Sequence, residues 1–245
     1  MAEFVCRNKI EIYPPISDSY EVKEAYKIFR TNFTFCGDNN RVIALTSCMP
    51  NEGKTTLVVS LASCLAEMGK RVLVIDADMR KSHMHTRYAC DPYELGLSHY
   101  LSGQAEFEDV IVETQFDGLC MLFAGHYPPN PVELLEGDRF AALLSAARES
   151  FDYVLVDTPP IGAVIDAAVV AKNCDGIMMV FATDRVRGRF AKKCIEQLQK
   201  SGCPILGAVL NMVPHRSKRE YSKYYKRYYG HYYGHYYGTR GPVKK

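Results

Sequence analysis

The sequence predicts an α/β fold with a mostly parallel central sheet and helices on both faces. Three observations support this prediction. Short apolar runs recur along the chain, segments of helical periodicity alternate with them, and the runs are apolar throughout, as is typical of parallel strands buried on both sides. The predicted strands are residues 42–45, 71–75, 119–123, 153–156, 176–182 and 205–212.

Segments of helical periodicity separate these runs. The first helix is expected from about Ser17 to Phe35, with Ser17 or Asp18 as its cap. It precedes the first core strand, so we expect it on the outside of the domain. Residues 1–16 are expected to be irregular, and the region from 81 to about 117 to be a polar stretch with one short helix. The other predicted helices are 57–68, 96–101, 131–135, 139–149, 164–172 and 188–201.

Composition divides the chain into a domain and a tail. Residues 215–245 hold nine lysines and arginines against one glutamate, a charge of +8; because the whole chain carries +2, residues 1–214 carry −6. The tail also holds nine of the seventeen tyrosines and almost no aliphatic residues. We therefore expect a globular domain over 1–214 and a flexible, basic, tyrosine-rich tail over 215–245.

The cysteines and the apolar runs indicate the cell compartment. Nine cysteines are dispersed without a Cys-x-x-Cys pair, which favours reduced thiols over a disulfide framework or a zinc site. No signal peptide opens the sequence, and no apolar run approaches the roughly 20 residues of a membrane helix. We expect a soluble cytoplasmic protein, whose membrane role, if any, depends on a partner.

The stretch RVIALTSCMPNEGKTT, residues 41–56, predicts a phosphate-binding loop. A buried strand leads into the loop, and a Gly-Lys-Thr-Thr sequence opens a helix whose first N–H groups and dipole suit an anion. Gly53 would let the backbone approach the phosphates, Lys54 would reach the β- and γ-phosphates, and the Thr55 hydroxyl would bind Mg²⁺. The predicted nucleotide contacts in the loop are Pro50, Asn51, Glu52, Gly53, Lys54, Thr55 and Thr56.

The loop departs from the common motif at two positions. The usual first glycine falls on Cys48, and Pro50 stiffens the middle of the loop. On these residues alone, an ordinary strand-to-helix turn remains the alternative.

Acidic residues follow two further predicted strands. Asp157 comes after an apolar run, where a magnesium-binding aspartate is common, although a helix cap is the simpler role for a lone aspartate. Asp76 and Asp78 are two positions apart, so in an extended segment their carboxylates point the same way. Buried acids repel each other unless a cation is present. Together with Lys54 and Thr55, they predict a P-loop NTPase-like domain that binds a nucleotide and Mg²⁺.

The complete set of motifs resembles the bacterial tyrosine kinases, or BY-kinases, of the Gram-positive capsular and extracellular polysaccharide type. The segment SCMPNEGKTT is similar to their Walker A loop, VLVIDADMR to their Walker A′ motif and VLVDTPP to their Walker B motif. Residues 131–135 match their PVELL segment, and a tyrosine-rich carboxyl-terminal tail is typical of the family. The resemblance extends over essentially the whole chain.

This resemblance implies an ATP-dependent protein-tyrosine kinase that autophosphorylates its tail and regulates polysaccharide synthesis and export. Kinases of this split type are cytosolic, and a transmembrane polysaccharide co-polymerase adaptor activates them and recruits them to the inner face of the cell membrane. A ring-shaped homo-oligomer and a protein-tyrosine phosphatase are also implied, and nucleic acid is not expected as a partner. The tail tyrosines are Tyr221, Tyr224, Tyr225, Tyr228, Tyr229, Tyr232, Tyr233, Tyr236 and Tyr237.

Single residues receive roles within this scheme. By resemblance, Asp76 is the candidate base for the tyrosine hydroxyl, and Lys54 would neutralise charge on the phosphates. Arg80 would hold the A′ loop or a neighbour's phosphate. Asn211, at the end of the last strand, is a candidate adenine contact or a plain strand-end turn. The predicted magnesium ligands are Thr55, Asp78 and Asp157.

Two departures from the family pattern affect the loop and the assembly. Asn51 replaces a glycine of the usual PGEGK loop, and because asparagine tolerates a left-handed conformation, we expect the loop to keep its function. The family's oligomerisation motif Glu-x-x-Arg-x-x-Arg is matched by Glu24, Lys27 and Arg30. Lysine cannot make the bidentate contact of arginine, which leaves the strength of ring assembly open.

Two other classes of protein compete with this interpretation. A partitioning or division-site ATPase of the ParA/MinD type carries a second lysine early in its loop, where this chain has Ser47, Cys48 and Met49. A nucleic-acid-binding protein would use the basic aromatic tail, and its binding to single strands would depend steeply on salt.

Overall fold

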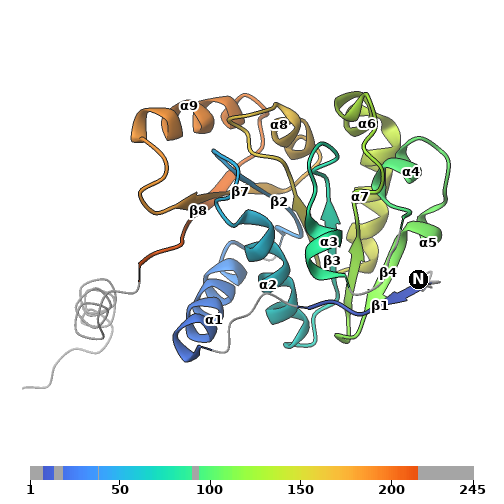
Figure 1. The fold of residues 1–245 in the computed structure, drawn as a ribbon, viewed down its shortest axis with the longest axis horizontal. Helices are drawn as coiled ribbons and strands as arrows, with labels where there is room; N and C mark the ends of the chain where they lie inside the picture. Colours follow the sequence, from blue (N-terminus) through green and yellow to red (C-terminus); the bar gives the residue numbers. More distant parts are fainter. Residues whose placement is uncertain (1–7, 14–18, 38, 90–93, 215–245) are drawn as a thin grey trace, which may run out of the picture. The chain divides into compact units, whose positions relative to one another are not determined.

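The computed structural model of the protein describes residues 8–13, 19–37, 39–89 and 94–214 (Figure 1). Two compact units are distinguished, Met1–Asn211 and Met212–Lys245. All helices and strands named below belong to the first unit. The tail tyrosines, residues 221–237, lie outside the described residues.

An eight-stranded sheet forms the centre of the first unit, in the order β1-β4-β5-β3-β6-β2-β7-β8. Every neighbouring pair is parallel except β4 and β5, so the predicted mostly parallel sheet is confirmed. The strands are β1 (Asn8–Ile10), β2 (Val42–Ser47), β3 (Val72–Asp76), β4 (Ile111–Thr114), β5 (Leu119–Leu122), β6 (Tyr153–Asp157), β7 (Gly176–Ala182) and β8 (Ile205–Asn211).

Helices cover both faces of the sheet, because alternate residues of the buried strands face two different apolar cores (Figure 1). In β2, Val42 and Ala44 belong to one core, and Ile43 and Leu45 to the other. The second core is completed by α1 (Tyr20–Thr34), α2 (Lys54–Ala66) and α3 (Met84–Tyr88). The first core is completed by α4 (Leu97–Leu101), α5 (Phe107–Val110), α6 (Pro131–Glu136), α7 (Asp138–Ser150), α8 (Asp166–Ala171) and α9 (Gly188–Gln199).

The six predicted strands are present, but the sequence analysis misses β1, β4, α3 and α5. The expectation that residues 1–16 are irregular is wrong for Asn8–Ile10, which pair in parallel with β4. The polar stretch from 81 to about 117 is expected from the sequence to hold one short helix, but its described residues form three helices and β4. These elements have only three to five residues, too few for a period to show, and distant pairing stabilises both strands.

The first helix begins at Tyr20, and its cap is Ser19. Ser17 and Asp18, the predicted caps, lie outside the described residues. The Ser19 hydroxyl donates to Glu21 Oε2 at 2.7 Å, and it caps no backbone N–H group. The helix packs on α2 at the outside of the sheet, with Phe33 buried edge-to-face against Tyr153.

Two aspartates fasten the amino ends of the central strands. Asp175, between α8 and β7, accepts the Arg41 and Val42 N–H groups at 2.9 and 2.8 Å and forms a bidentate ion pair with Arg148 of α7. Asp152 accepts the Arg71 N–H group at 2.8 Å in the same way. The starts of β2 and β3 are therefore held by side chains at the edge opposite to the predicted site.

Two further expectations concern membrane helices and thiols. Within the described ranges, no helix is both long and apolar enough to cross a bilayer. None of the seven cysteines in those ranges forms a disulfide with another described residue. Cys6 and Cys90 lie outside the described residues.

Candidate functional site

The loop between β2 and α2 lies at the carboxyl ends of the central strands, where ligands bind in open α/β sheets. It turns through two residues of left-handed conformation, Asn51 with φ of 63° and Gly53 with φ of 81°. The first of these agrees with the expectation that asparagine can replace glycine here. Lys54 begins α2, so the amino end of a 13-residue helix faces the loop.

Side chains from other elements hold this loop in shape. The Glu52 carboxylate is buried, and it accepts the N–H groups of Met49 at 2.7 Å and of Ala182 at 3.0 Å. The Asn211 amide at the end of β8 donates to the Glu52 carbonyl oxygen at 2.9 Å. Glu52 and Asn211, both predicted as nucleotide contacts, are thus placed as supports of the loop.

The structure brings Lys54, Thr55 and Asp157 together. The Lys54 ammonium group is buried and forms an ion pair with Asp157 Oδ1 at the end of β6. The Thr55 hydroxyl donates to the other carboxylate oxygen, Oδ2, at 2.7 Å. A cation, a hydroxyl group and a carboxylate therefore meet at the start of α2, as the predicted phosphate and magnesium site requires.

Asp76 lies directly beside Asp157, because the register of β3 on β6 pairs these two residues. Both side chains are buried. Burial, and then the neighbouring Asp157, raise the pKa of Asp76 to about 8, while a hydrogen bond from the Ser82 hydroxyl acts against the rise. Burial also raises the pKa of Asp157, against the opposing effect of Lys54. The site thus contains a carboxyl group that can exchange a proton near neutral pH.

Asp78 and Arg80 lie in the turn that follows β3. The Asp78 carboxylate accepts the N–H groups of Arg80 and Lys81 at 3.3 and 3.0 Å, and its own N–H donates to Asp76 at 3.1 Å. The Arg80 guanidinium binds both carboxylate oxygens of the fully buried Asp166 at 2.7 and 3.1 Å. Arg80 therefore ties the turn after β3 to the first residue of α8.

The remaining predicted residues are placed as follows. Pro50 is exposed in the loop, and the Thr56 hydroxyl makes a hydrogen bond of 2.9 Å to the Tyr88 hydroxyl of α3. On α1, Lys27 forms an ion pair with Glu24 at 2.7 Å, whereas Arg30 donates to the Cys64 carbonyl of α2 at 3.0 Å. The candidate oligomerisation residues thus have partners within the same chain.

Sequence reasoning missed three residues around the site: Ser82, Asp166 and Tyr127. Ser82 donates to Asp76, and its carbonyl accepts the Tyr127 hydroxyl at 2.7 Å. Asp166 carries the only sequence signal of the three, an acid in the first turn of a helix, but nothing in the sequence pairs it with Arg80. Their contacts depend on the crossing of loops that are distant in the chain.

The donor set suits magnesium better than a transition metal. Within the described ranges, no group of three or more His, Cys, Asp or Glu side chains is placed to hold a metal ion. Asp157 and the Thr55 hydroxyl offer one carboxylate and one neutral oxygen, and Mg²⁺ usually takes one or two carboxylates with substrate phosphates and water.

Comparison with known proteins identifies relatives of this chain. A family model described as an AAA domain matches residues 40–201. The chain is 39% identical to the tyrosine-protein kinase CpsD of Streptococcus agalactiae over 204 residues, which cover 83% of this chain and 89% of that protein. The kinase domain of the Escherichia coli tyrosine kinase ETK superposes with a TM-score of 0.77 and 33% identity, over 86% of this chain and 85% of that one.

A division-site ATPase is also similar, at a greater distance. The septum site-determining protein MinD of Pyrococcus horikoshii, solved with Mg-ADP, has a TM-score of 0.60 and 27% identity, over 73% of this chain and 72% of that one. MinD is therefore a fold relative, and the ParA/MinD alternative is not the family of this chain. The mostly parallel sheet, the Lys54–Asp157 cluster at its carboxyl edge and the close similarity to CpsD and ETK show that the chain belongs to the bacterial tyrosine-protein kinases.

Proposed function

We propose that this kinase transfers the γ-phosphoryl group of Mg-ATP to tyrosines of the tail, and that it thereby regulates the synthesis and export of a capsular or extracellular polysaccharide. The observation that supports the proposal most directly is the cluster of Lys54, Thr55 and Asp157 beside the protonatable carboxyl of Asp76. These are the charged and polar groups that phosphoryl transfer needs, at the end of a helix that suits an anion.

The nucleotide would lie along the loop from Pro50 to Thr56. Backbone N–H groups at the start of α2 would contact the phosphates, and Lys54 would exchange its contact with Asp157 for the β- and γ-phosphates. Thr55 and Asp157 would then be free to hold Mg²⁺, with Asp78 close by in the turn after β3. The bound cation supplies positive charge that offsets the charge of the phosphates during transfer.

Asp76 is the proposed general base. A tyrosine hydroxyl has a pKa near 10, so its attack is assisted when a neighbouring group takes the proton. The phenolic oxygen forms the new bond to the γ-phosphorus while the bond to the β–γ bridging oxygen breaks, and the proton passes to the Asp76 carboxylate. A carboxylate whose pKa lies near 8 is a stronger base than an ordinary aspartate. Arg80 would keep the turn that carries these acids in place through Asp166.

The acceptors proposed are the nine tyrosines from Tyr221 to Tyr237. The domain boundary proposed is the one that composition suggests, with the kinase domain over 1–214 and the tail over 215–245. The tail's charge of +8 favours its encounter with the acidic domains of the same or neighbouring molecules.

We also propose the partners that membership of the split kinases implies. A transmembrane co-polymerase adaptor would activate the enzyme and hold it at the inner face of the membrane, a ring of several copies would bring tails to neighbouring active sites, and a protein-tyrosine phosphatase would reverse the reaction. The helix α1, with Glu24, Lys27 and Arg30 on its surface, would contribute to the ring.

One experiment tests this function. The whole protein is incubated with Mg-ATP, with and without a peptide from the cytoplasmic end of a candidate adaptor, and phosphotyrosine is mapped by mass spectrometry. Phosphate on residues 221–237 that is lost in Lys54→Met supports the proposal. Release of inorganic phosphate without any phosphotyrosine, in both conditions, would favour a nucleotide-gated ATPase.

A further inference from the structure

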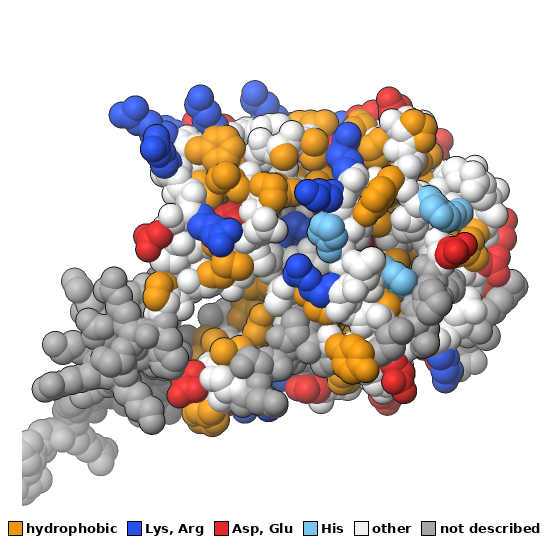
Figure 2. Space-filling view, viewed as in Figure 1, with side chains coloured by type: hydrophobic (Ala, Val, Ile, Leu, Met, Phe, Trp, Pro, Cys, Tyr) orange, Lys and Arg blue, Asp and Glu red, His pale blue; other side chains and the backbone are white. Residues whose placement is uncertain are grey.

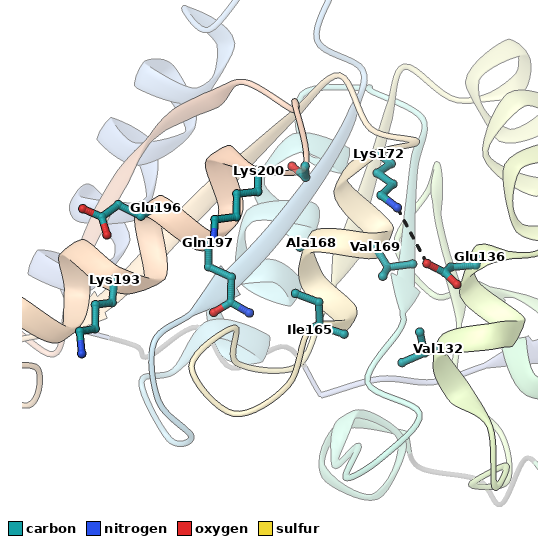
Figure 3. Close-up of a pocket in the computed structure, with 11 residues that line it drawn as sticks. Val132, Glu136, Ile165, Ala168, Val169, Lys172, Lys193, Glu196, Gln197 and Lys200 are labelled. Atoms are coloured by element: carbon teal, nitrogen blue, oxygen red, sulfur yellow. Dashed lines mark ion pairs between the residues drawn. The ribbon is translucent and has the colours of Figure 1, made fainter.

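A groove on the outer side of the layer formed by α6, α8 and α9 has no part in the kinase reaction proposed above (Figure 3). Its volume is about 590 Å³, enough for several side chains of a bound segment. The floor is apolar and consists of Val132 from α6, Ile165 directly before α8, and Ala168 and Val169 from α8. Ile165 is 43% exposed, which is unusual for an isoleucine beside a core helix.

The α9 side of the groove is lined by Lys193, Glu196, Gln197 and Lys200, and it belongs to a basic segment of the chain. Residues 185–200 hold six lysines and arginines against the single acid Glu196, a charge of +5, although residues 1–214 together carry −6. Figure 2 shows these basic side chains gathered over the α9 end of the molecule, next to apolar side chains. A concentration of one sign of charge on a body of the opposite sign indicates a binding surface for an anionic partner.

Ion pairs neutralise the acids of the groove and leave two lysines available. Glu136 of α6 pairs with Lys172 at the end of α8 at 3.8 Å (Figure 3). Glu196 pairs with Lys192 at 3.9 Å. Lys193 and Lys200 line the groove, and neither forms an ion pair with any residue that the structure describes. These two lysines are therefore the cations that a ligand would meet.

The spacing of the two lysines defines the ligand. Lys193 lies in α9, and Lys200, seven positions later, is the helical-conformation residue that caps its end. This spacing places them on one side of the helix and about 10 Å apart along its axis. In an extended peptide, side chains three positions apart are separated by about 10 Å as well. We propose that the groove binds a segment of a partner protein in which two acidic residues, three positions apart, enclose aliphatic residues. The acids would pair with Lys193 and Lys200, and the aliphatic side chains would cover Ile165 and Val132.

Anionic lipid or nucleic acid would complement the positive charge of the groove but not its apolar floor. A membrane surface is flat and cannot enter a groove, and a nucleic acid backbone offers no aliphatic side chain for Ile165. The combination of an apolar floor and two lysines spaced by two helical turns favours a peptide over both.

The test is a binding titration with a defined probe. A fluorescein-labelled peptide, in which two glutamates three positions apart enclose two leucines, is titrated with the whole protein, and its anisotropy gives the Kd. Lys193→Glu/Lys200→Glu is compared with Arg187→Glu/Arg189→Glu, which makes the same change of charge near the start of the same helix, outside the groove lining. Ile165→Ser tests the floor. Circular dichroism and thermal unfolding show whether each variant is folded.

We expect Lys193→Glu/Lys200→Glu to weaken binding about tenfold or more and Ile165→Ser to weaken it severalfold, whereas Arg187→Glu/Arg189→Glu changes it less than about twofold. A peptide with glutamines in place of the glutamates should bind the unchanged protein as weakly as the glutamate peptide binds Lys193→Glu/Lys200→Glu. Equal loss in the two charge-reversal pairs, no measurable binding of the probe, or displacement of the probe by anionic phospholipid vesicles would overturn the proposal. None of these readouts depends on kinase activity, so they are independent of the function proposed above.

Discussion

Asp76 and Asp157 meet because β3 and β6 are neighbours in register, so the repulsion between them is built into the sheet. Two groups reduce that repulsion: Lys54 forms an ion pair with Asp157, and Ser82 donates a hydrogen bond to Asp76. The pKa of Asp76 nevertheless rises to about 8, mainly through burial. At the residue scale, Asp76 therefore retains in the native state a proton that it would release in the unfolded chain.

This retained proton makes stability depend on pH in a defined direction. The pKa of Asp76 in the native state, about 8, lies above the usual value of 3.8, so between these two pH values the native protein binds more protons than the unfolded chain. Its stability therefore falls as the pH rises from about 4 to about 8. The Asp76→Asn variant has no ionisable group at this position. We therefore expect it to lose less stability than the wild type over the same pH range.

The measurement is urea unfolding of both proteins at pH 5 and pH 8 in EDTA. The control is Asp117→Asn, which changes an aspartate outside the site. Unfolding curves that shift by the same amount with pH in wild type and Asp76→Asn would show that Asp76 is ionised at both pH values.

Lys54→Met should lower the rate of phosphotransfer by about 10²- to 10³-fold, because it removes a charge that stabilises the transition state. The structure adds a second effect. Lys54 is the cation that balances the buried Asp157, so its loss leaves two buried acids side by side. We expect the variant to be less stable at pH 8 than at pH 6. Phosphotyrosine immunoblotting and thermal unfolding measure the two effects, and near-normal phosphorylation in a folded variant would contradict the assignment.

The sequence could predict most of these residues, because loops at the ends of parallel strands meet at one edge of a sheet. Lys54, Thr55, Asp76 and Asp157 were placed in that way. It could not predict that Glu52 and Asn211 support the loop, or that Arg80 binds Asp166. Those contacts depend on which side chains face each other after the sheet is assembled, and no local pattern records this.

At the element scale, the link between Arg80 and Asp166 joins the turn after β3 to α8. Asp166 is fully buried, so removal of the arginine leaves its charge without a partner, whereas removal of both groups does not. We expect Arg80→Ala and Asp166→Ala each to destabilise the protein, and the double variant to be less destabilised than the sum, with a coupling energy of about 1 to 3 kcal/mol. Urea unfolding of the four proteins gives this value. Strict additivity would mean that the two side chains do not stabilise each other in solution.

The helix α1 carries the candidate assembly residues, and its contacts allow a sharper test than its sequence did. Arg30 already donates to the Cys64 carbonyl of α2, so Arg30→Ala affects packing as well as any neighbour. We expect Glu24→Ala with Arg30→Ala to reduce the mass in solution, measured by light scattering, if α1 contributes to a ring. Lys27→Ala is the matched control for loss of the Glu24 ion pair alone. An unchanged mass in the double variant would assign these residues to packing.

The short strands and helices are the elements that could not be predicted from the sequence. A strand such as β1, with the sequence Asn-Lys-Ile, has no apolar run of its own, and its backbone is paired by β4 about a hundred residues away. The long buried strands and the helices α2, α7 and α9 could be recognised because their periods extend over several turns or strand repeats. Predictability therefore followed element length.

At the scale of the whole molecule, a ligand that binds the native state stabilises it by mass action. Mg-ATP at about a hundred times its Kd should add about 2.7 kcal/mol, which corresponds to a rise in Tm of about 5 to 10 °C for a domain of this size. Differential scanning fluorimetry measures the rise. EDTA should remove most of it, because Thr55 and Asp157 are the proposed ligands of the cation that accompanies the nucleotide. A rise of the same size in Lys54→Met would argue that the nucleotide binds elsewhere.

The hydrogen bonds by which Asp175 and Asp152 hold the amino ends of β2 and β3, here called the clamps, affect how such a protein can change in evolution. Asp175 and Asp152 secure β2 and β3 at one edge of the sheet through bonds to backbone N–H groups, while the loops that carry the chemistry lie at the other edge. Insertions and substitutions in those loops leave the clamps untouched. A new reaction can therefore arise without a new scaffold, and one architecture can serve both a protein-modifying enzyme and a division-site ATPase such as MinD.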